Sequence, residues 1–152
     1  MFKFEFTDTW SKETNKMLAA FGLEDHGRVQ KAVDKAVIDY MMHYWAWDTG
    51  NLARSAYNAT DIGSGIVIYP GPYAHYMYYG EIYGPNFPTE FDEDGNVLQW
   101  RSPAGQKKHP TGRFMKYKKD ANPKAGWFPF QRMMVEHGDD ILEEARKVVR
   151  DK

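Results

Sequence analysis

The chain lacks cysteine, carries almost no net charge and contains no long apolar run, and each of these absences narrows its function. Without cysteine, the 152-residue chain has no disulfide, no thiolate nucleophile and no cysteine-ligated zinc, as expected for a protein that matures in a reducing cytoplasm. A formal net charge of −1 provides no general basic field for nucleic acid. The apolar runs are too short to predict a membrane span, and the alternating residues 1–6 do not resemble a signal peptide.

Aromatic side chains are abundant instead. Ten tyrosines, nine phenylalanines and five tryptophans make up 16% of the chain, although its apolar fraction is only 42%. Tyr and Trp combine a large apolar area with a polar group, which suits a core that continues into a protein–protein interface. The length predicts a single domain over residues 1–152, large enough to bury roughly 70% of its unfolded surface.

The strongest secondary-structure signal covers residues 26–45. Apolar and aromatic side chains recur there with the spacing of one helical face, at Val29, Ala32, Val33, Ala36, Val37, Tyr40, Met41 and Tyr44. Polar residues, Asp34 among them, take the opposite face. Ile38, Met42 and Trp45 add a second apolar stripe near the end of the helix, which is covered either by a loop of the same chain or by a neighbouring subunit.

The remaining elements are shorter, except for a second long helix at the C-terminus. The patterns predict a strand over residues 2–6, helices over 10–21, 51–56, 73–79 and 129–150, and hairpins with strands at 57–60 and 66–69 and at 87–91 and 97–100. Gly22 and Gly80 are the predicted stops of two of these helices. Prolines and glycines repeatedly interrupt residues 81–124, which therefore form a long irregular insertion. The predicted fold class is α+β, a small antiparallel sheet with two long helices packed on one face.

No arrangement of residues indicates catalysis or metal binding. The histidines show no metal-binding spacing. Residues 92–103 superficially resemble a calcium loop, but the glycine comes too early and Pro103 replaces the last carboxylate, so a hairpin turn explains them better. Ser64, between two adjacent glycines, lacks the spacing of a nucleophile elbow. We therefore expect no reaction, cofactor or metal; a hydrolase would instead require a polar cleft around His75 or His137.

Positive charge is concentrated in residues 101–124, where Asp120 is the only acidic residue. The basic side chains are Arg101, Lys107, Lys108, Arg113, Lys116, Lys118, Lys119 and Lys124. They form either a phosphate-binding surface for DNA or a solvated arm that charge keeps soluble. The acidic residues 90–94 could equally pair with the basic residues of an adjacent copy.

Three short segments carry a resemblance to a known family. They are Asp48, Thr49, Gly50, Asn51, Leu52 and Ser55 after the first long helix, then Tyr73, Ala74, Tyr76, Tyr79 and Gly80, and finally Trp127, Phe128 and Pro129 before the C-terminal helix. In this order they resemble the minor capsid and head–tail joining (tail-completion, or neck) proteins of long-tailed bacteriophages and prophages. The resemblance covers nearly the whole chain apart from residues 81–124.

The same segments have a physical interpretation. Gly50 permits backbone angles that other residues avoid, so the chain can turn sharply before Leu52 enters the core. The aromatic side chains of residues 73–79 either cover the neighbouring hairpin as part of the core or pack on a neighbouring subunit.

The resemblance implies a virion protein with no reaction of its own, made in the bacterial host cytoplasm. Copies of the chain would form or join a ring between the portal or connector and the tail proteins, with a passing contact to phage DNA. The insertion 81–124 would become ordered upon assembly. The alternatives are a tail terminator, a capsid decoration protein, or a small nucleic-acid-binding module that uses residues 101–124.

Overall fold

The computed structural model describes residues 16, 19–47, 49–71 and 73–151 and has the α+β composition predicted from the sequence. In chain order its elements are α2 (Arg28–Met41), α3 (Asn51–Ala59), α4 (Ala74–Tyr79), β1 (Glu81–Gly84), β2 (Phe87–Phe91), β3 (Val97–Arg101), β4 (His109–Phe114) and α5 (Pro129–Arg150). The predicted strand 2–6 and most of the predicted helix 10–21 lie outside the described residues. Gly22, the predicted stop of that helix, has φ 73°.

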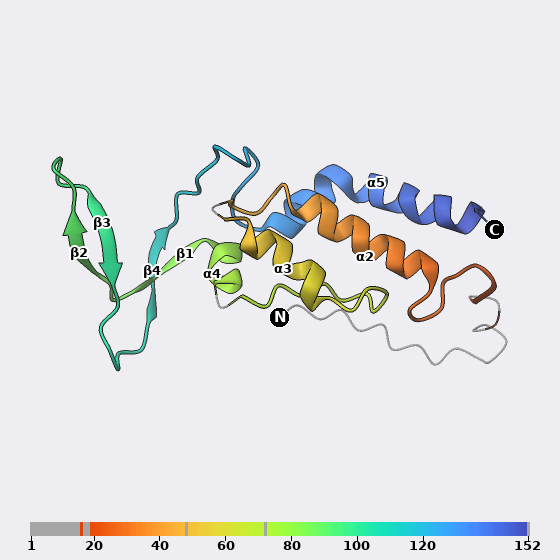
Figure 1. Ribbon diagram of the computed structural model, residues 1–152, viewed down its shortest axis with the longest axis horizontal. Helices are drawn as coiled ribbons and strands as arrows, with labels where there is room; N and C mark the ends of the chain where they lie inside the picture. The colour runs from red at the N-terminus through yellow and green to blue at the C-terminus, as the bar shows by residue number, and fades with distance from the viewer. Residues whose placement is uncertain (1–15, 17–18, 48, 72, 152) are drawn as a thin grey trace.

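The two long helices, α2 and α5, pack along each other and form the body of the protein (Figure 1). The apolar spacing of α2 puts Ile38 and Met41 in the core, and the matching face of α5 buries Met133 and Ile141. Pro129 occupies the first turn of α5, where its missing N–H has no intrahelical partner in any case. Both long helices are therefore as expected, although α2 is shorter than the predicted residues 26–45.

Helix α2 ends at Met41, where the backbone hydrogen bonds change from four residues back to three. The N–H groups of His43 and Tyr44 bond to carbonyls three residues back, at 3.2 and 3.0 Å. The side-chain amide of Asn122 donates to the carbonyl oxygens of Met42 and Trp45, at 2.8 and 2.9 Å. These bonds satisfy carbonyls that a continuing helix would have used. Tyr44 and Trp45 remain fully buried, so a loop of the same chain covers this end of α2.

The hairpin predicted for residues 57–69 is wrong. Helix α3 continues to Ala59 through the first predicted strand, and no strand is assigned within the second, Ile66 to Tyr69. The N–H of Ile68 instead bonds to the Thr60 hydroxyl at 3.0 Å. A short apolar run does not distinguish a strand from an extended segment that packs through its side chains.

Asp34 is the second correction, because it is buried instead of lying on the polar face of α2. Its carboxylate accepts hydrogen bonds from the backbone N–H groups of Gly63 and Gly65, at 2.7 and 3.2 Å, and from the Gln30 amide at 2.7 Å. These bonds compensate for the cost of burying a carboxylate and fasten residues 61–65 to the helix.

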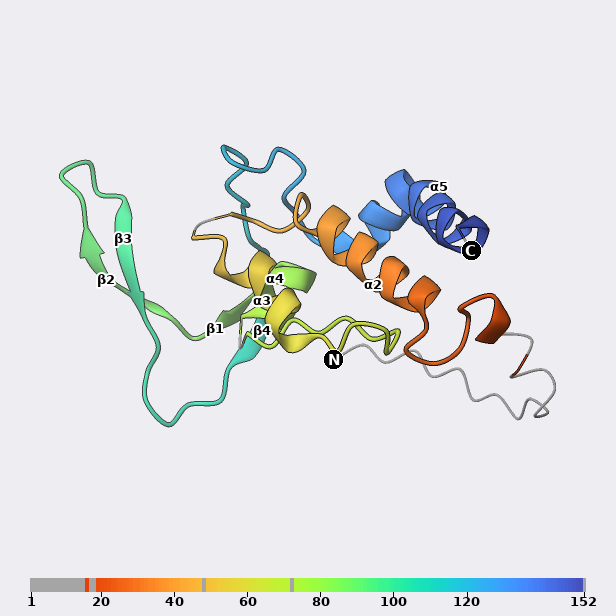
Figure 2. The same cartoon turned by 45° about the vertical axis from the view of Figure 1, so that its right-hand side comes forward.

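The strands of the described residues lie within residues 81–124 and form two antiparallel ribbons, β1–β4 and β2–β3. The predicted hairpin of β2 and β3 is confirmed, whereas the pairing of β1 with β4 was not predicted. Figures 1 and 2 show the ribbon β2–β3 beyond β1–β4, away from the helices. We call residues 81–114 the arm.

Candidate assembly surface

The base of the arm begins at the short helix α4, which Gly80 ends. Gly80 has φ 71° and its N–H bonds to the carbonyl of Tyr76 at 2.8 Å. A Cβ atom at Gly80 would lie 2.7 Å from the hydroxyl oxygen of Tyr117 and 3.4 Å from Trp127. The predicted stop is thus confirmed, and close approach of two other segments adds a second requirement for glycine.

Hydrogen bonds fasten these segments to α4. The hydroxyl of Tyr117 donates to the carbonyl of Met77 at 2.7 Å, and the N–H of Met115 donates to the carbonyl of Gly80 at 2.7 Å. The N–H of Phe128 donates to the carbonyl of Tyr78 at 2.8 Å. The second and third segments of the resemblance therefore meet in space, with the end of the arm held between them.

Tyr78 and Tyr117 keep their protons at this junction. Burial raises the pKa of both phenols, and it is the largest cause in each case. The Tyr78 hydroxyl donates to the Gln131 side chain at 2.6 Å. Both tyrosines are therefore neutral hydrogen-bond donors at physiological pH.

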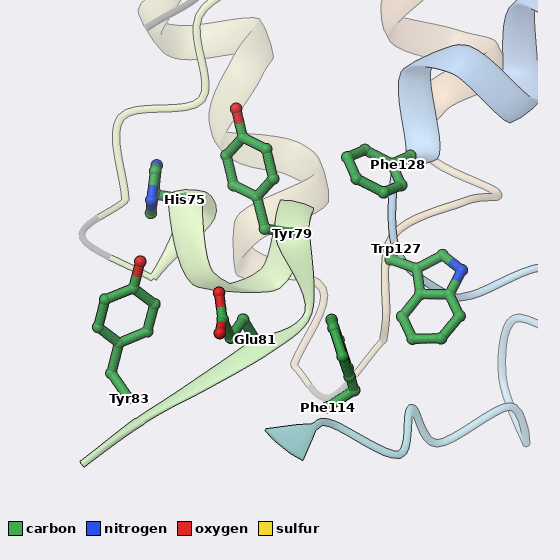
Figure 3. Close-up of a pocket in the computed structure, with 7 residues that line it drawn as sticks. All are labelled: His75, Tyr79, Glu81, Tyr83, Phe114, Trp127 and Phe128. Atoms are coloured by element: carbon green, nitrogen blue, oxygen red, sulfur yellow. The ribbon is translucent and has the colours of Figure 1, made fainter. Parts of the chain in front are cut away.

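Beside this junction lies an open hollow of about 600 Å³, which we call the aromatic hollow (Figure 3). Its lining residues are His75, Tyr79, Glu81, Tyr83, Phe114, Trp127 and Phe128, contributed by α4, β1, the end of β4 and the residues before α5. The rings of Phe114 and Trp127 meet edge to face at 5.4 Å, and those of Tyr79 and Phe128 at 5.8 Å. Phe114, Trp127 and Phe128 are nevertheless exposed, so the hollow presents apolar ring surface to solvent.

Phe128 is held in an unusual conformation at the edge of the hollow. Its φ of 47° is left-handed, which costs a non-glycine residue roughly 1–2 kcal/mol. The backbone bond to Tyr78 and the ring contacts with Tyr78 and Tyr79 hold it there. The aromatic residue before Pro129 therefore both shapes the start of α5 and lines the hollow.

The first segment of the resemblance lies at the start of α3. Gly50 has φ 75°, and the ring of Trp47 lies 2.5 Å from where its Cβ would be. The Thr49 hydroxyl accepts a long 3.4 Å bond from the N–H of Asn51, and the Ser55 hydroxyl donates to the carbonyl of Leu52 at 2.7 Å. Leu52 is half-buried against the core, as expected. Asp48 lies outside the described residues.

The remaining residues of the second segment differ in exposure. Tyr73 is the most exposed of them, at 73%. Tyr76 is half-buried and its ring contacts Tyr83 at 5.0 Å. Ala74 is half-buried in the first turn of α4. None of them covers a hairpin formed by residues 57–69, because that hairpin is absent from the described residues.

The basic residues of the insertion lie along the arm and the chain that leaves it. Arg101 is on β3, Arg113 is on β4, and Lys107, Lys108, Lys116, Lys118 and Lys119 lie in the connecting segments. All are exposed, and none forms an ion pair with another described residue. Lys124 differs, because it pairs with Glu136 and lies over the ring of Tyr44.

The two histidines that a hydrolase would need have different surroundings. His75 lies at the edge of the aromatic hollow. The ring of His137 stacks on Tyr40 at 4.4 Å, and its Nδ1 lies 2.8 Å from Asp140. Within the described part of the chain, no cluster of three or more histidine or acidic side chains is arranged to hold a metal ion.

Sequence reasoning missed part of the hollow. Glu81, Tyr83 and Phe114 reach it through the pairing of β1 with β4, and neither strand shows a regular alternation of apolar and polar residues. Phe114 lies among the basic residues of 101–124, and this interleaving is the local signal that could have indicated a surface role.

Comparison with protein-family models, curated proteins and solved structures gives no match for this chain. No helix in the described part of the chain has the length and apolarity needed to cross a membrane.

Proposed function

We propose that the protein is a non-enzymatic structural component of the head–tail junction of a long-tailed phage or prophage. Its copies assemble through subunit contacts into or onto a neck ring. Its partners are then other copies, the portal or connector and the tail proteins, with phage DNA passing through. It is located in the virion.

The observation that carries the proposal is the exposed apolar surface of the arm and its base. Soluble monomers rarely expose large contiguous apolar patches, and such patches mark interaction sites. Here the exposed rings gather where the second and third segments of the resemblance meet, at the aromatic hollow, and along the ribbon β2–β3. Aromatic residues are also the side chains that most often dominate protein–protein contacts.

A projecting arm further supports assembly into a ring. Closed rings require heterologous contacts, in which one patch of a subunit meets a different patch of the next. The arm carries its ribbon β2–β3 away from the helical body (Figures 1 and 2). The aromatic hollow lies at the base of the arm. The chain therefore presents two distinct surfaces, as a ring requires.

Two measurements test this proposal. Electron microscopy of the purified protein at increasing concentration should show closed oligomers of one size. Quantitative mass spectrometry of virions of the phage or prophage that encodes it should find a small fixed copy number, as expected for a neck ring, whereas a decoration protein would be present at far higher copy number. Absence from virions, together with a monomer at all concentrations, would overturn the proposal.

The exposed basic residues favour one other function, a nucleic-acid-binding module. Binding to duplex DNA over a salt series distinguishes the two. A module that neutralises several phosphates loses affinity steeply with salt, and the double substitution Lys118→Ala with Lys119→Ala should reduce that slope by about 2. Substitution of Lys31 and Lys35, exposed on α2, is the matched control. A neck protein needs neither micromolar affinity nor a steep slope.

A further inference from the structure

No described helix or strand covers the ribbon β2–β3. All of β2 and nearly all of β3 is exposed. Its large apolar side chains Phe87, Phe91, Leu98 and Trp100 are 55%, 57%, 64% and 55% exposed. An isolated two-stranded hairpin is marginally stable in water and normally needs a further layer to cover its apolar side chains.

Charge at the hairpin turn is of one sign. Glu90, Asp92, Glu93 and Asp94 are acidic, and no basic residue lies between Phe87 and Asn96. Asp92 folds the turn, because its carboxylate accepts bonds from the N–H groups of Asp94 and Asn96 at 3.0 and 2.7 Å. The side chain of Asn96 and these N–H groups lower the pKa of Asp92, so the carboxylate stays ionised. We call these acidic residues the acidic turn.

Basic residues adjoin the aromatic hollow in sequence. Phe114 lines the hollow, and the exposed Arg113 and Lys116 lie within two residues of Phe114 along the chain, with Lys118 and Lys119 following. Among the lining residues, Glu81 and His75 are the titratable groups other than the tyrosines. A lining of apolar rings followed by a basic segment of chain complements a hairpin of apolar rings with an acidic turn.

The hollow of the same copy is not accessible to the hairpin. The ribbon β1–β4 forms one wall of the hollow and also carries β2 and β3 outward. Figures 1 and 2 both show β2 and β3 on the far side of that ribbon from the helices. The hairpin therefore needs a complementary surface on another molecule, and the aromatic hollow of a second copy provides one.

From this complementarity we propose that the β2–β3 hairpin of one copy docks on the aromatic hollow of the next, with its acidic turn against Arg113 and Lys116. The inference rests on the proposed assembly function and identifies the contact that builds it. The three aromatic side chains and Leu98 have only 55–64% of their surface left to bury, so the hairpin gives a contact at or below the small end of specific interfaces. We expect weak association in solution that closure of a ring reinforces.

Cross-linking tests the pairing, and the absence of natural cysteine makes it unambiguous. A Gln99→Cys variant on the hairpin is mixed with a Lys118→Cys variant beside the hollow, under mild oxidation at high protein concentration. We expect the mixed disulfide to exceed, by about tenfold, that formed by Gln99→Cys with the control Lys35→Cys on α2. Equal yields from the two mixtures would overturn the inference.

Charge reversal provides an independent test in the otherwise unchanged protein. The double variant Glu93→Lys with Asp94→Lys, and separately Arg113→Glu with Lys116→Glu, should each weaken association about tenfold in sedimentation velocity. An equimolar mixture of the two variants should recover association, because each can then pair with the other. Lys31→Glu with Lys35→Glu, which reverses charge on α2, should have no effect.

The two hypotheses fail in different ways. Rings that persist in both charge-reversal variants, without the mixed disulfide, would disprove the docking of the hairpin while leaving the neck proposal intact. A protein absent from virions would disprove the neck proposal, even where the hairpin joins two copies.

Discussion

The backbone N–H of Phe128 donates a 2.8 Å hydrogen bond to the carbonyl oxygen of Tyr78, and this bond joins the end of α4 to the start of α5. The two residues are far apart in sequence; Phe128 directly precedes Pro129, and Tyr78 lies two residues before Gly80. Around them the end of the arm, the aromatic hollow and the long C-terminal helix are assembled.

The close approach at Gly80 predicts a large effect of adding one methyl group. Gly80→Ala must place an alanine at φ 71° with its Cβ 2.7 Å from the Tyr117 hydroxyl, so we expect a loss of about 2–4 kcal/mol in the free energy of unfolding. Gly65→Ala is the control, because Gly65 has a similar φ of 72°. A Cβ atom added there would lie 3.4 Å from its nearest neighbour, the Gln30 side chain. This control substitution should cost only about 1 kcal/mol. Equal losses in urea denaturation would show that the approach of Tyr117 does not matter.

Asp34 should be one of the polar residues most important for stability. Asp34→Ala removes the acceptor for the N–H groups of the buried Gly63 and of Gly65, and we expect it to cost about 2–4 kcal/mol. Asp34→Asn keeps one oxygen for these groups and should cost about 1 kcal/mol. The neighbouring exposed Lys35→Ala should change stability by less than about 0.5 kcal/mol in thermal unfolding. If Asp34→Ala behaved like Lys35→Ala, the loop 61–65 would not depend on the carboxylate.

Stability should depend on pH through His26. The hydrogen bond to Asp61, at 2.9 Å, and then the nearby Asp25 raise the pKa of His26 above its ordinary 6.5. Since the folded state favours the protonated imidazole, this stabilisation is complete below pH 6.5 and disappears as the pH rises through the higher pKa of the folded state. The melting temperature of the native protein should therefore fall as the pH rises from 6.5 through the pKa of His26 in the folded state. His26→Gln should remove this pH dependence, and Asp61→Asn should reduce it, because Asp25 remains beside the imidazole; a pH dependence unchanged in both variants must come from another group.

The arm should open far more readily than the body. Its ribbon β2–β3 is exposed along almost its whole length, whereas α2 and α5 bury each other's apolar faces. At low protein concentration, where copies do not associate, amides of residues 87–101 should exchange with deuterium about 100-fold faster or more than those of α2. Residues 129–150 serve as an internal reference. Equal protection of the arm and of α2 would mean that the hairpin is stable by itself and needs no partner.

The sequence alone determined the elements whose signal is local. The helical period of residues 28–41 and 129–150, the hairpin turn at Asp92 and the stop at Gly80 all follow from nearby residues. The α+β class follows from these as well. Such elements are set by short-range sterics and by one apolar face, which can be read from spacing.

Only the tertiary structure decided which segments meet. The pairing of β1 with β4, the burial of Asp34 and the bond between Phe128 and Tyr78 all join residues distant in the chain. The same reasoning explains why the hairpin predicted at 57–69 is wrong. The Thr60 hydroxyl accepts a hydrogen bond from the N–H of Ile68 in place of a strand ladder, and α3 continues to Ala59. Contacts of this kind depend on which hydrogen-bonding groups the rest of the chain leaves without a partner. A local sequence pattern does not contain that information.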